Sequence, residues 1–165
     1  QARAEGNGIM TRDTNTPIVG GDRTTGSELS IGVTVLGTVR HPLVRSGAKT
    51  GDALWVTGRL GGPMLALEAF ERGEAPTPVH RHRFARPVPR LREAQWLAES
   101  GATAAIDISD GVVSDAGHLA AASRQEISID LDRLPLIEGA SADGAARRGE
   151  ESERLVTGPF TLCAV

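Results

Sequence analysis

Tyrosine is absent from this 165-residue chain, and cysteine occurs once, as Cys163. A single cysteine excludes an intrachain disulfide framework and a zinc site built on cysteines. Aromatic residues make up only 3% of the chain, so a core has to be built from valine, leucine, isoleucine and alanine. No run approaches the ~20 apolar residues of a membrane span, and no signal peptide is visible. These absences make a cytoplasmic protein the default expectation.

A strong charge of either sign is also missing. The net charge is −3, with 24% charged and 39% hydrophobic residues, as in an ordinary globular protein. The slight acidity provides no electrostatic reason to expect nucleic acid or an anionic membrane as a partner. Glycine, in contrast, is plentiful, with 20 residues. That abundance indicates tight turns, or backbone that approaches a ligand closely.

Apolar periodicity predicts both strands and helices. Alternation with a period of two predicts a strand at 29–39, and helical spacing of apolar residues predicts a helix at 112–123. This mixture fits an α/β or an α+β fold. The full prediction has strands at 17–19, 29–39, 53–57, 104–108 and 127–131, and helices at 63–72, 91–100 and 112–123. Residues 73–90 are predicted to form a long basic connection. Residues 1–16 fit a linker or a frayed helix end, and 138–154 fit a loop or a surface helix.

The strongest chemical signal is the sequence Ile-Asp-Ile-Ser-Asp-Gly at 106–111. A strand would deliver Asp107 and Asp110 to its carboxyl end, where a helix begins. Free N–H groups at a helix N-terminus attract phosphate oxygens, and carboxylates tolerate phosphate when Mg²⁺ lies between them. Ser109 could donate to a phosphate oxygen. Ser-Asp-Gly is equally a common turn in which either polar residue can cap the helix, so the segment alone fits both interpretations.

Other segments carry weaker signals. Gly21 and Asp22 end a short strand, where they could approach a ligand and hold a metal, or simply form a turn. Arg45 lies in a basic turn and could reach a phosphate or remain in solvent. The glycine-rich segment 58–62 lacks the Lys-Ser/Thr ending of a P-loop. The basic segment 80–83 has no paired ligands at metal-binding spacing, which favours a solvated loop.

Together, the order and spacing of these segments resemble thiamine-monophosphate kinase over about residues 8–135. The resemblance is carried by Gly-Gly-Asp at 20–22, Leu-Ser-Ile-Gly-Val-Thr-Val-Leu-Gly at 29–37, the Arg-Ser-Gly-Ala-Lys block that opens 45–58, Arg-Pro-Val-Pro-Arg-Leu at 86–91, and 105–118. The wider superfamily includes aminoimidazole ribonucleotide synthetase, selenide water dikinase and a hydrogenase maturation factor.

The resemblance implies ATP-dependent phosphorylation of thiamine monophosphate to thiamine diphosphate by direct transfer of the γ-phosphoryl group. It implies a homodimer with the two-domain, aminoimidazole ribonucleotide synthetase-like fold. No catalytic nucleophile is assigned, because phosphoryl transfer relies on metal and cation clamps. The implied Mg²⁺ ligands are Asp22, Asp107 and Asp110, and the implied ATP contacts are Gly21, Asp22, Arg45 and Ser109.

The resemblance further implies that residues 1–42 are the end of an N-terminal nucleotide-binding and dimerisation domain, and that 43–165 form a truncated C-terminal α/β domain. We therefore expect a fragment that lacks the family's N-terminal aspartate motifs. The family also carries a Gly-Gly-Glu-Asp-Tyr-Glu block, which here reads Thr-Gly-Pro-Phe-Thr-Leu at 157–162, without a carboxylate. Two alternatives follow: a related ATP-dependent enzyme with another substrate, or a degenerate, non-catalytic domain.

Overall fold

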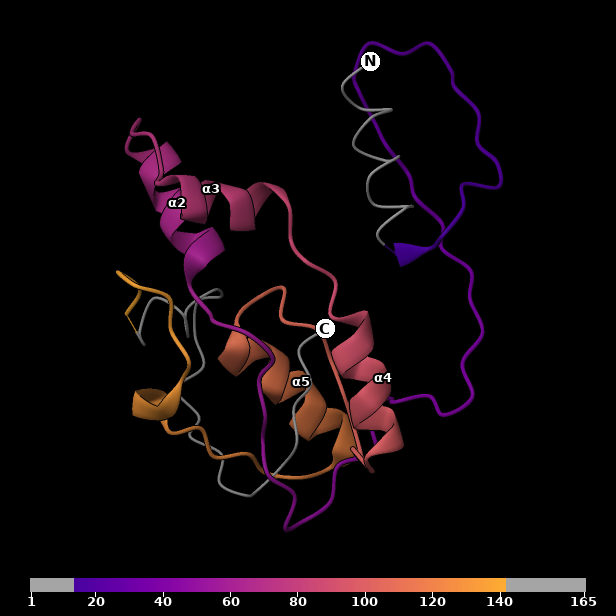
Figure 1. Ribbon diagram of the computed structural model, residues 1–165, viewed down its shortest axis with the longest axis vertical. Coiled ribbons are helices and arrows are strands. Elements are labelled where there is room, and N and C mark those ends of the chain that lie inside the picture. Colours follow the sequence, from indigo (N-terminus) through magenta and orange to yellow (C-terminus); the bar gives the residue numbers. More distant parts are fainter. Residues whose placement is uncertain (1–13, 142–165) are drawn as a thin grey trace. The chain divides into compact units, whose positions relative to one another are not determined.

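The computed structural model describes residues 14–141 (Figure 1). The chain divides into two compact units, one ending at Arg40 and the other beginning at His41. Residues 15–40 of the first unit form neither helix nor strand. The family-based domain boundary after residue 42 stays a prediction. The second unit contains α2 (Gly62–Glu71), α3 (Pro78–Ala85), α4 (Leu91–Glu99), α5 (Val112–Ser123) and the short 3-10 helix η1 (Leu131–Arg133).

The three predicted helices are confirmed to within one residue at each end, as α2, α4 and α5. The predicted stop of α4 at Gly101 is also confirmed, because Gly101 adopts a φ of 90°. The N–H of Ala102 donates to the carbonyl of Leu97 at 2.9 Å, which closes the last turn as glycine-terminated helices commonly do. None of the helices in the described part of the chain is long and apolar enough to cross a membrane.

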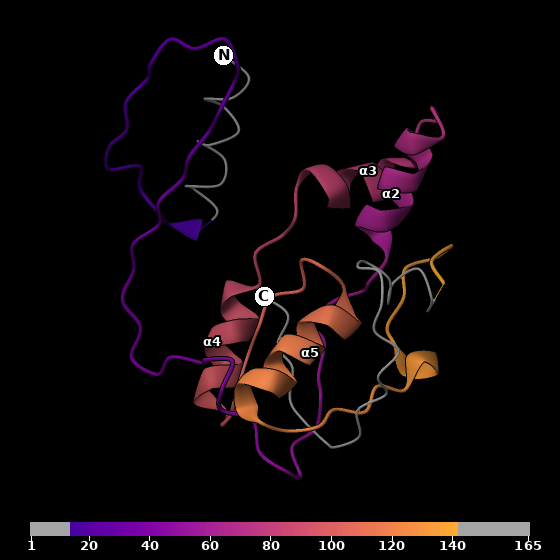
Figure 2. The same ribbon diagram turned by 180° about the vertical axis from the view of Figure 1, so that it is seen from behind.

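The segment 73–90 was predicted only as a long basic connection, and the helix α3 that occupies its centre was missed. Thr77 caps this helix by accepting a hydrogen bond from the N–H of His80 at 3.3 Å, and Pro78 holds the first helical position. Thr followed by Pro is a helix-start signal that the basic composition of the segment concealed. Figures 1 and 2 show α2 and α3 side by side, and the rings of Phe70 and Phe84 meet edge to face at 5.6 Å.

The α/β (α+β) class is confirmed only in its helices, since residues 14–141 contain no strand apart from one isolated parallel bridge between Leu60 and Leu136. The segments predicted as strands at 17–19, 29–39, 53–57, 104–108 and 127–131 have no helical or strand assignment. The alternating side chains of 29–39 are mostly exposed, from 64% at Leu29 to 79% at Val33. Alternation indicates which face would be buried, but a strand also requires a hydrogen-bonded neighbour, and that is not a local property.

The core of the second unit forms where α5 packs on extended segments. Leu119 and Ala116 of α5 are fully or almost fully buried, in one cluster with Ala104, Ile106 and Ile127. These segments are extended and contact the same helix face without pairing into a ladder. The fold therefore places the turn at 109–111, which joins 104–108 to α5, at one end of this core.

Asp52 gives the second unit a pH-dependent contribution to stability. The hydroxyl of Thr103 and then the backbone N–H of Lys49 donate to its carboxylate, and these two bonds hold the pKa of Asp52 below its ordinary value. A lowered pKa means that the ionised carboxylate stabilises the fold above the unfolded value of about 3.9, and that this contribution disappears as the pH falls through the folded value.

Replacing Asp52 by asparagine is therefore expected to lower the urea midpoint at pH 7 and to have progressively less effect below about pH 4. Urea unfolding of both proteins between pH 2 and pH 7 measures this. A gap between wild type and Asp52→Asn that stays constant across that range would contradict the account. Glu126→Gln serves as the control, because Glu126 is exposed and its carboxylate makes no hydrogen bond within residues 14–141.

Several sequence-based predictions lie outside the described residues. They include the altered block at 157–162 and the interpretation of Cys163 as a buried apolar residue. Most of the predicted linker at 1–16 and of the loop at 138–154 also falls there.

Candidate functional site

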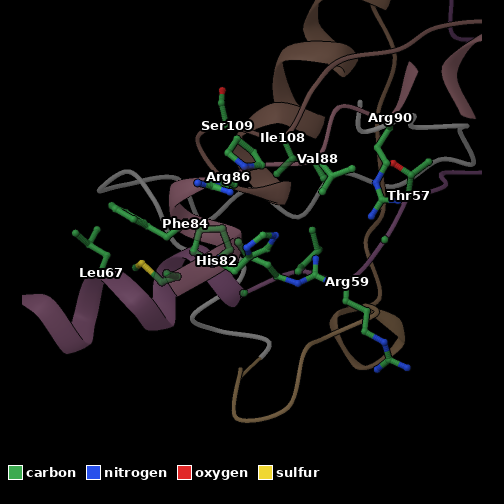
Figure 3. A pocket seen from close by; sticks show the side chains of 18 of the residues that line it. Thr57, Arg59, Leu67, His82, Phe84, Arg86, Val88, Arg90, Ile108 and Ser109 are labelled. Atoms are coloured by element: carbon green, nitrogen blue, oxygen red, sulfur yellow. The ribbon is translucent and has the colours of Figure 1, made fainter. Parts of the chain in front are cut away.

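A cavity of about 400 Å³ opens in the second unit where α2, α3 and three connecting segments meet (Figure 3). We call it the α2–α3 cavity. Its walls come from the start of α2, the end of α3, and the segments 57–61, 86–90 and 108–111. Four arginines and one carboxylate, that of Asp110, line it. The chain as a whole is acidic, so this cavity is a local concentration of positive charge.

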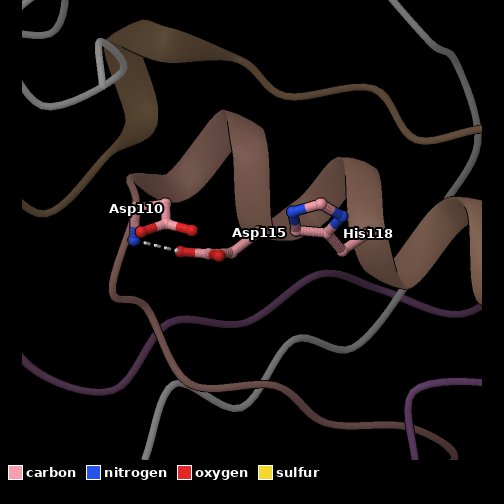
Figure 4. A group of neighbouring side chains, drawn as sticks. All are labelled: Asp110, Asp115 and His118. Carbon is pink, nitrogen blue, oxygen red and sulfur yellow. Dashed lines mark hydrogen bonds between the residues drawn. The ribbon is translucent and has the colours of Figure 1, made fainter. Parts of the chain in front are cut away.

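The turn that bears Ser109 and Asp110 is held by a carboxylate of the helix that follows it. One oxygen of Asp115 accepts hydrogen bonds from the backbone N–H groups of Ser109, Asp110 and Gly111, at 3.0, 3.1 and 3.2 Å. Asp115 is only 2% exposed and lies in the first turns of α5, so its charge also faces the positive end of the helix dipole. Figure 4 shows the side chain of Asp115 directed back at the turn.

This arrangement corrects two expectations for the turn. The helix cap is Gly111, with no side-chain hydrogen bond of its own, rather than Ser109 or Asp110. The N–H groups of the turn itself are taken by Asp115, so they are not available to a phosphate as the sequence suggested. The side chains of Ser109 and Asp110 remain exposed, because neither is needed for the cap.

Asp110, Asp115 and His118 gather on one side of the start of α5 (Figure 4), with one potential ligand atom from each lying within 4.8 Å of the others. Asp110 and His118 are exposed, and Asp115 is buried. Mg²⁺ prefers oxygen ligands and commonly takes one or two carboxylates together with substrate phosphates. Asp110 fits that role. Asp115 is already engaged by three N–H groups, and a histidine nitrogen is a poor ligand for this ion.

Two other predicted site residues of the second unit do not line the α2–α3 cavity. Asp107 is exposed on the segment before the turn. The backbone of Arg45 lies by the other end of α5, where its carbonyl accepts a 2.7 Å hydrogen bond from the hydroxyl of Ser123. The twelve residues of α5 span about 18 Å, so the backbone at Arg45 is well removed from the turn.

Gly21 and Asp22 belong to the first unit. Both are exposed, and Gly21 has a positive φ of 154°, which residues with a side chain rarely adopt. Their shared site with Asp107 and Asp110 stays a prediction.

Sequence reasoning missed the basic side chains that line the cavity, which we call its basic wall. The interpretation of 80–83 as a solvated loop is wrong, since the whole segment lies on α3. Two of its residues, His82 and Arg83, line the cavity. The remaining basic lining residues had no role assigned from sequence. The sequence did contain a signal for this basic wall, namely several arginines at irregular spacing: Arg59, Arg83, Arg86 and Arg90.

Comparison with known proteins identifies the relatives of this chain. No family model matches it. A thiamine-monophosphate kinase from Methanopyrus kandleri is 36% identical over 160 residues, covering 90% of this chain. One from Rhodopirellula baltica is 40% identical over 125 residues, covering 74%. This chain is a relative of the thiamine-monophosphate kinases.

A solved structure agrees with this relationship. The thiamine-monophosphate kinase from Stenotrophomonas maltophilia superposes with a TM-score of 0.59 at 34% identity, over 65% of this chain and 39% of that one. The chain spans 52% of the Methanopyrus kinase and 34% of the Rhodopirellula kinase. It therefore aligns with about half, or less, of the length of the thiamine-monophosphate kinases it matches.

Proposed function

We propose that the protein phosphorylates thiamine monophosphate to thiamine diphosphate, with ATP as the phosphoryl donor and Mg²⁺ as the metal. The relationship to thiamine-monophosphate kinases supports this activity. The observation that carries it in the structure is the exposed carboxylate of Asp110 at the edge of a cavity lined with arginines. Carboxylates that hold a metal, next to cations that hold phosphate, are what phosphoryl transfer requires.

In this proposal Asp107, Asp110 and Asp22 hold Mg²⁺, which neutralises charge on the nucleotide phosphates when bound. Ser109 donates its hydroxyl to a phosphate oxygen, and Gly21 and Arg45 contact ATP. Asp115 positions Asp110 and Ser109 by holding their backbone N–H groups, without touching the reactants. The relatives also lead us to propose the aminoimidazole ribonucleotide synthetase-like fold, a homodimer and a cytoplasmic location.

Asp110→Asn is expected to weaken Mg-ATP binding by about tenfold, or about 1.4 kcal/mol, because the amide replaces a metal-binding carboxylate by a neutral group. Folding should be unaffected, since Asp115 bonds to the backbone of Asp110 and not to its side chain. The measurement is the thermal midpoint with ATP and either Mg²⁺ or EDTA, because a ligand that binds the folded state raises it.

Asp132→Asn, at an exposed aspartate of η1, is the matched control and should respond to Mg-ATP as wild type does. If the Mg²⁺-dependent rise in thermal midpoint is the same in wild type, Asp110→Asn and Asp107→Asn, neither carboxylate binds the metal. Product analysis with thiamine monophosphate then tests the transfer itself. Nucleotide binding without thiamine diphosphate formation would favour another acceptor, and absence of both would favour a non-catalytic domain.

A further inference from the structure

The four arginines that line the α2–α3 cavity are not equivalent. Arg59 donates to the carbonyl of Leu136 at 3.1 Å, and Figure 3 shows its guanidinium directed away from the other labelled side chains. Arg90 donates to Glu93 at 3.1 Å, and one of its terminal nitrogens lies against Gly58, 2.8 Å from where a Cβ would stand. These two arginines are already used to hold the surrounding chain.

Arg83 and Arg86 have no such role. No hydrogen bond or ion pair joins either side chain to any residue in the described range 14–141. Arg83 lies in the last turn of α3, and Arg86 is the residue that follows the helix as its C-cap. Both residues line the cavity, so two arginines without a partner among the described residues border the same space.

The aliphatic part of Arg83 is packed against α2. Its Cδ would lie 2.8 Å from a Cβ at Gly62, so the bare backbone of α2 makes room for the aliphatic part of the side chain. Gly62 is buried, and Arg83 is half-buried. A side chain seated in this way gives up less conformational freedom when its guanidinium binds a ligand.

The rest of the wall is apolar near these arginines. Met64, Leu67 and Phe84 line the same cavity, whose volume of about 400 Å³ is within the usual range for small-molecule sites. Guanidinium groups bind phosphate through paired N–H donors, and apolar walls suit an organic group attached to it. Asp110, in contrast, repels an anion unless a cation lies between them.

We infer that Arg83 and Arg86 bind the phosphate group of a small-molecule phosphate ester in the α2–α3 cavity, on the α3 side and apart from Asp110. The inference of an anion site depends only on the two unpaired guanidinium groups, and not on the proposed activity. Its assignment to the phosphate of the acceptor substrate rests on the proposed function. The class of ligand is a monophosphate ester whose organic part contacts Phe84, Met64 and Leu67.

A competing role for the same arginines is stabilisation of α3, because cations in the last turn of a helix offset its dipole. That role requires positive charge but not the guanidinium fork. Arg83→Lys combined with Arg86→Lys keeps the charge and removes the bidentate donors, so it separates helix stabilisation from phosphate recognition.

The test is calorimetric titration of the full chain with inorganic phosphate and with thiamine monophosphate, in EDTA and without ATP. These conditions make the result independent of the metal site and of phosphoryl transfer. We expect binding by wild type that weakens as salt is added, and a loss of about tenfold or more in the Arg83→Gln, Arg86→Gln double variant. The double lysine variant should lose most of that affinity while it keeps the thermal midpoint of wild type.

Arg81→Gln is the matched control, since Arg81 is exposed on α3 and does not line the cavity. It should bind phosphate as wild type does. The inference is overturned if wild type binds neither probe, or if the double glutamine variant binds as tightly as wild type. Phosphate binding that depends on both arginines in a protein that forms no thiamine diphosphate would support the site while removing the proposed activity.

Discussion

Asp115→Ala is expected to lower the free energy of unfolding by about 3 kcal/mol. One carboxylate oxygen of Asp115 accepts all three backbone N–H groups of the turn at 109–111. Hydrogen bonds to a charged group contribute about 1.5 to 3 kcal/mol each, and donors that lose a partner in a buried site incur a further desolvation cost. The three bonds share one acceptor and are not additive, so the expected loss is below their sum.

Chemical denaturation of wild type, Asp115→Ala and Asp115→Asn measures the effect. The asparagine variant keeps a carbonyl oxygen as acceptor and should lose less stability than the alanine variant. Asp132→Ala, at an exposed aspartate, should change the free energy of unfolding by less than about 0.5 kcal/mol. Equal stability of Asp115→Ala and wild type would show that the turn does not depend on this carboxylate.

The same substitution has a functional consequence. Asp115 holds the backbone that carries Ser109 and Asp110, so its loss should also weaken Mg-ATP binding without removing any group that touches the ligand. A positioning role of this kind predicts partial recovery in Asp115→Asn. Asp110→Glu, which keeps a carboxylate but moves it, should leave stability unchanged and alter binding alone.

The second large effect is expected at Gly47, where alanine should destabilise the chain by about 3 kcal/mol. A Cβ at this position would lie 1.8 Å from the carbonyl oxygen of Thr103 and 2.9 Å from its carbon. Both are backbone atoms, so the clash can be relieved only by separating two chain segments. Overpacking of this kind commonly costs about 1 to 3 kcal/mol, and a rigid neighbour places the estimate at the upper end.

Gly117→Ala is the matched control, because a Cβ on this exposed glycine of α5 would meet nothing within 4 Å. Alanine in a helix interior is more favourable than glycine, so this variant should gain about 0.5 to 1 kcal/mol. The two glycine-to-alanine changes are therefore expected to have opposite signs in urea unfolding. A stable Gly47→Ala protein would mean that segments 45–48 and 103–105 are not in contact.

This contact also explains part of the Arg-Ser-Gly-Ala-Lys block. Ala48 is buried, and its N–H donates to the hydroxyl of Ser123, which in turn donates to the carbonyl of Arg45. Gly47 and Ala48 are thus required by packing against 103–105 and α5. Their presence in the block supports the family relationship without making them ligands. The phosphate contact proposed for Arg45 remains a separate prediction.

The helices were predictable because their signals are local. In α5 the apolar side chains recur at helical spacing, and Gly101 after α4 provides the left-handed residue that ends that helix. The cap of α3, Thr77 before Pro78, was also present in the sequence. It was outweighed by a composition of arginine, histidine and proline that is typical of solvated connections.

Strands and the basic wall depend on distant residues, which periodicity does not report. The alternation at 29–39 marks a face to be covered, yet Leu29 and Val33 are largely exposed. The arginines at 83 and 86 acquire a common role only because α3 packs on α2 and brings them to one cavity. A count of charges along the chain cannot distinguish them from Arg81, which faces solvent.

Local sequence was sufficient to predict three helices, the turn that presents Ser109 and Asp110, and the relationship to thiamine-monophosphate kinases. Each of these depends on residues close together in the chain, or on the order of short motifs. Tertiary packing alone decided that Arg59 is engaged by the distant carbonyl of Leu136, and that the aliphatic part of Arg83 packs on the backbone of Gly62. Hydrogen-bond partners and close backbone contacts are set by the approach of separate segments, and sequence spacing does not specify that approach.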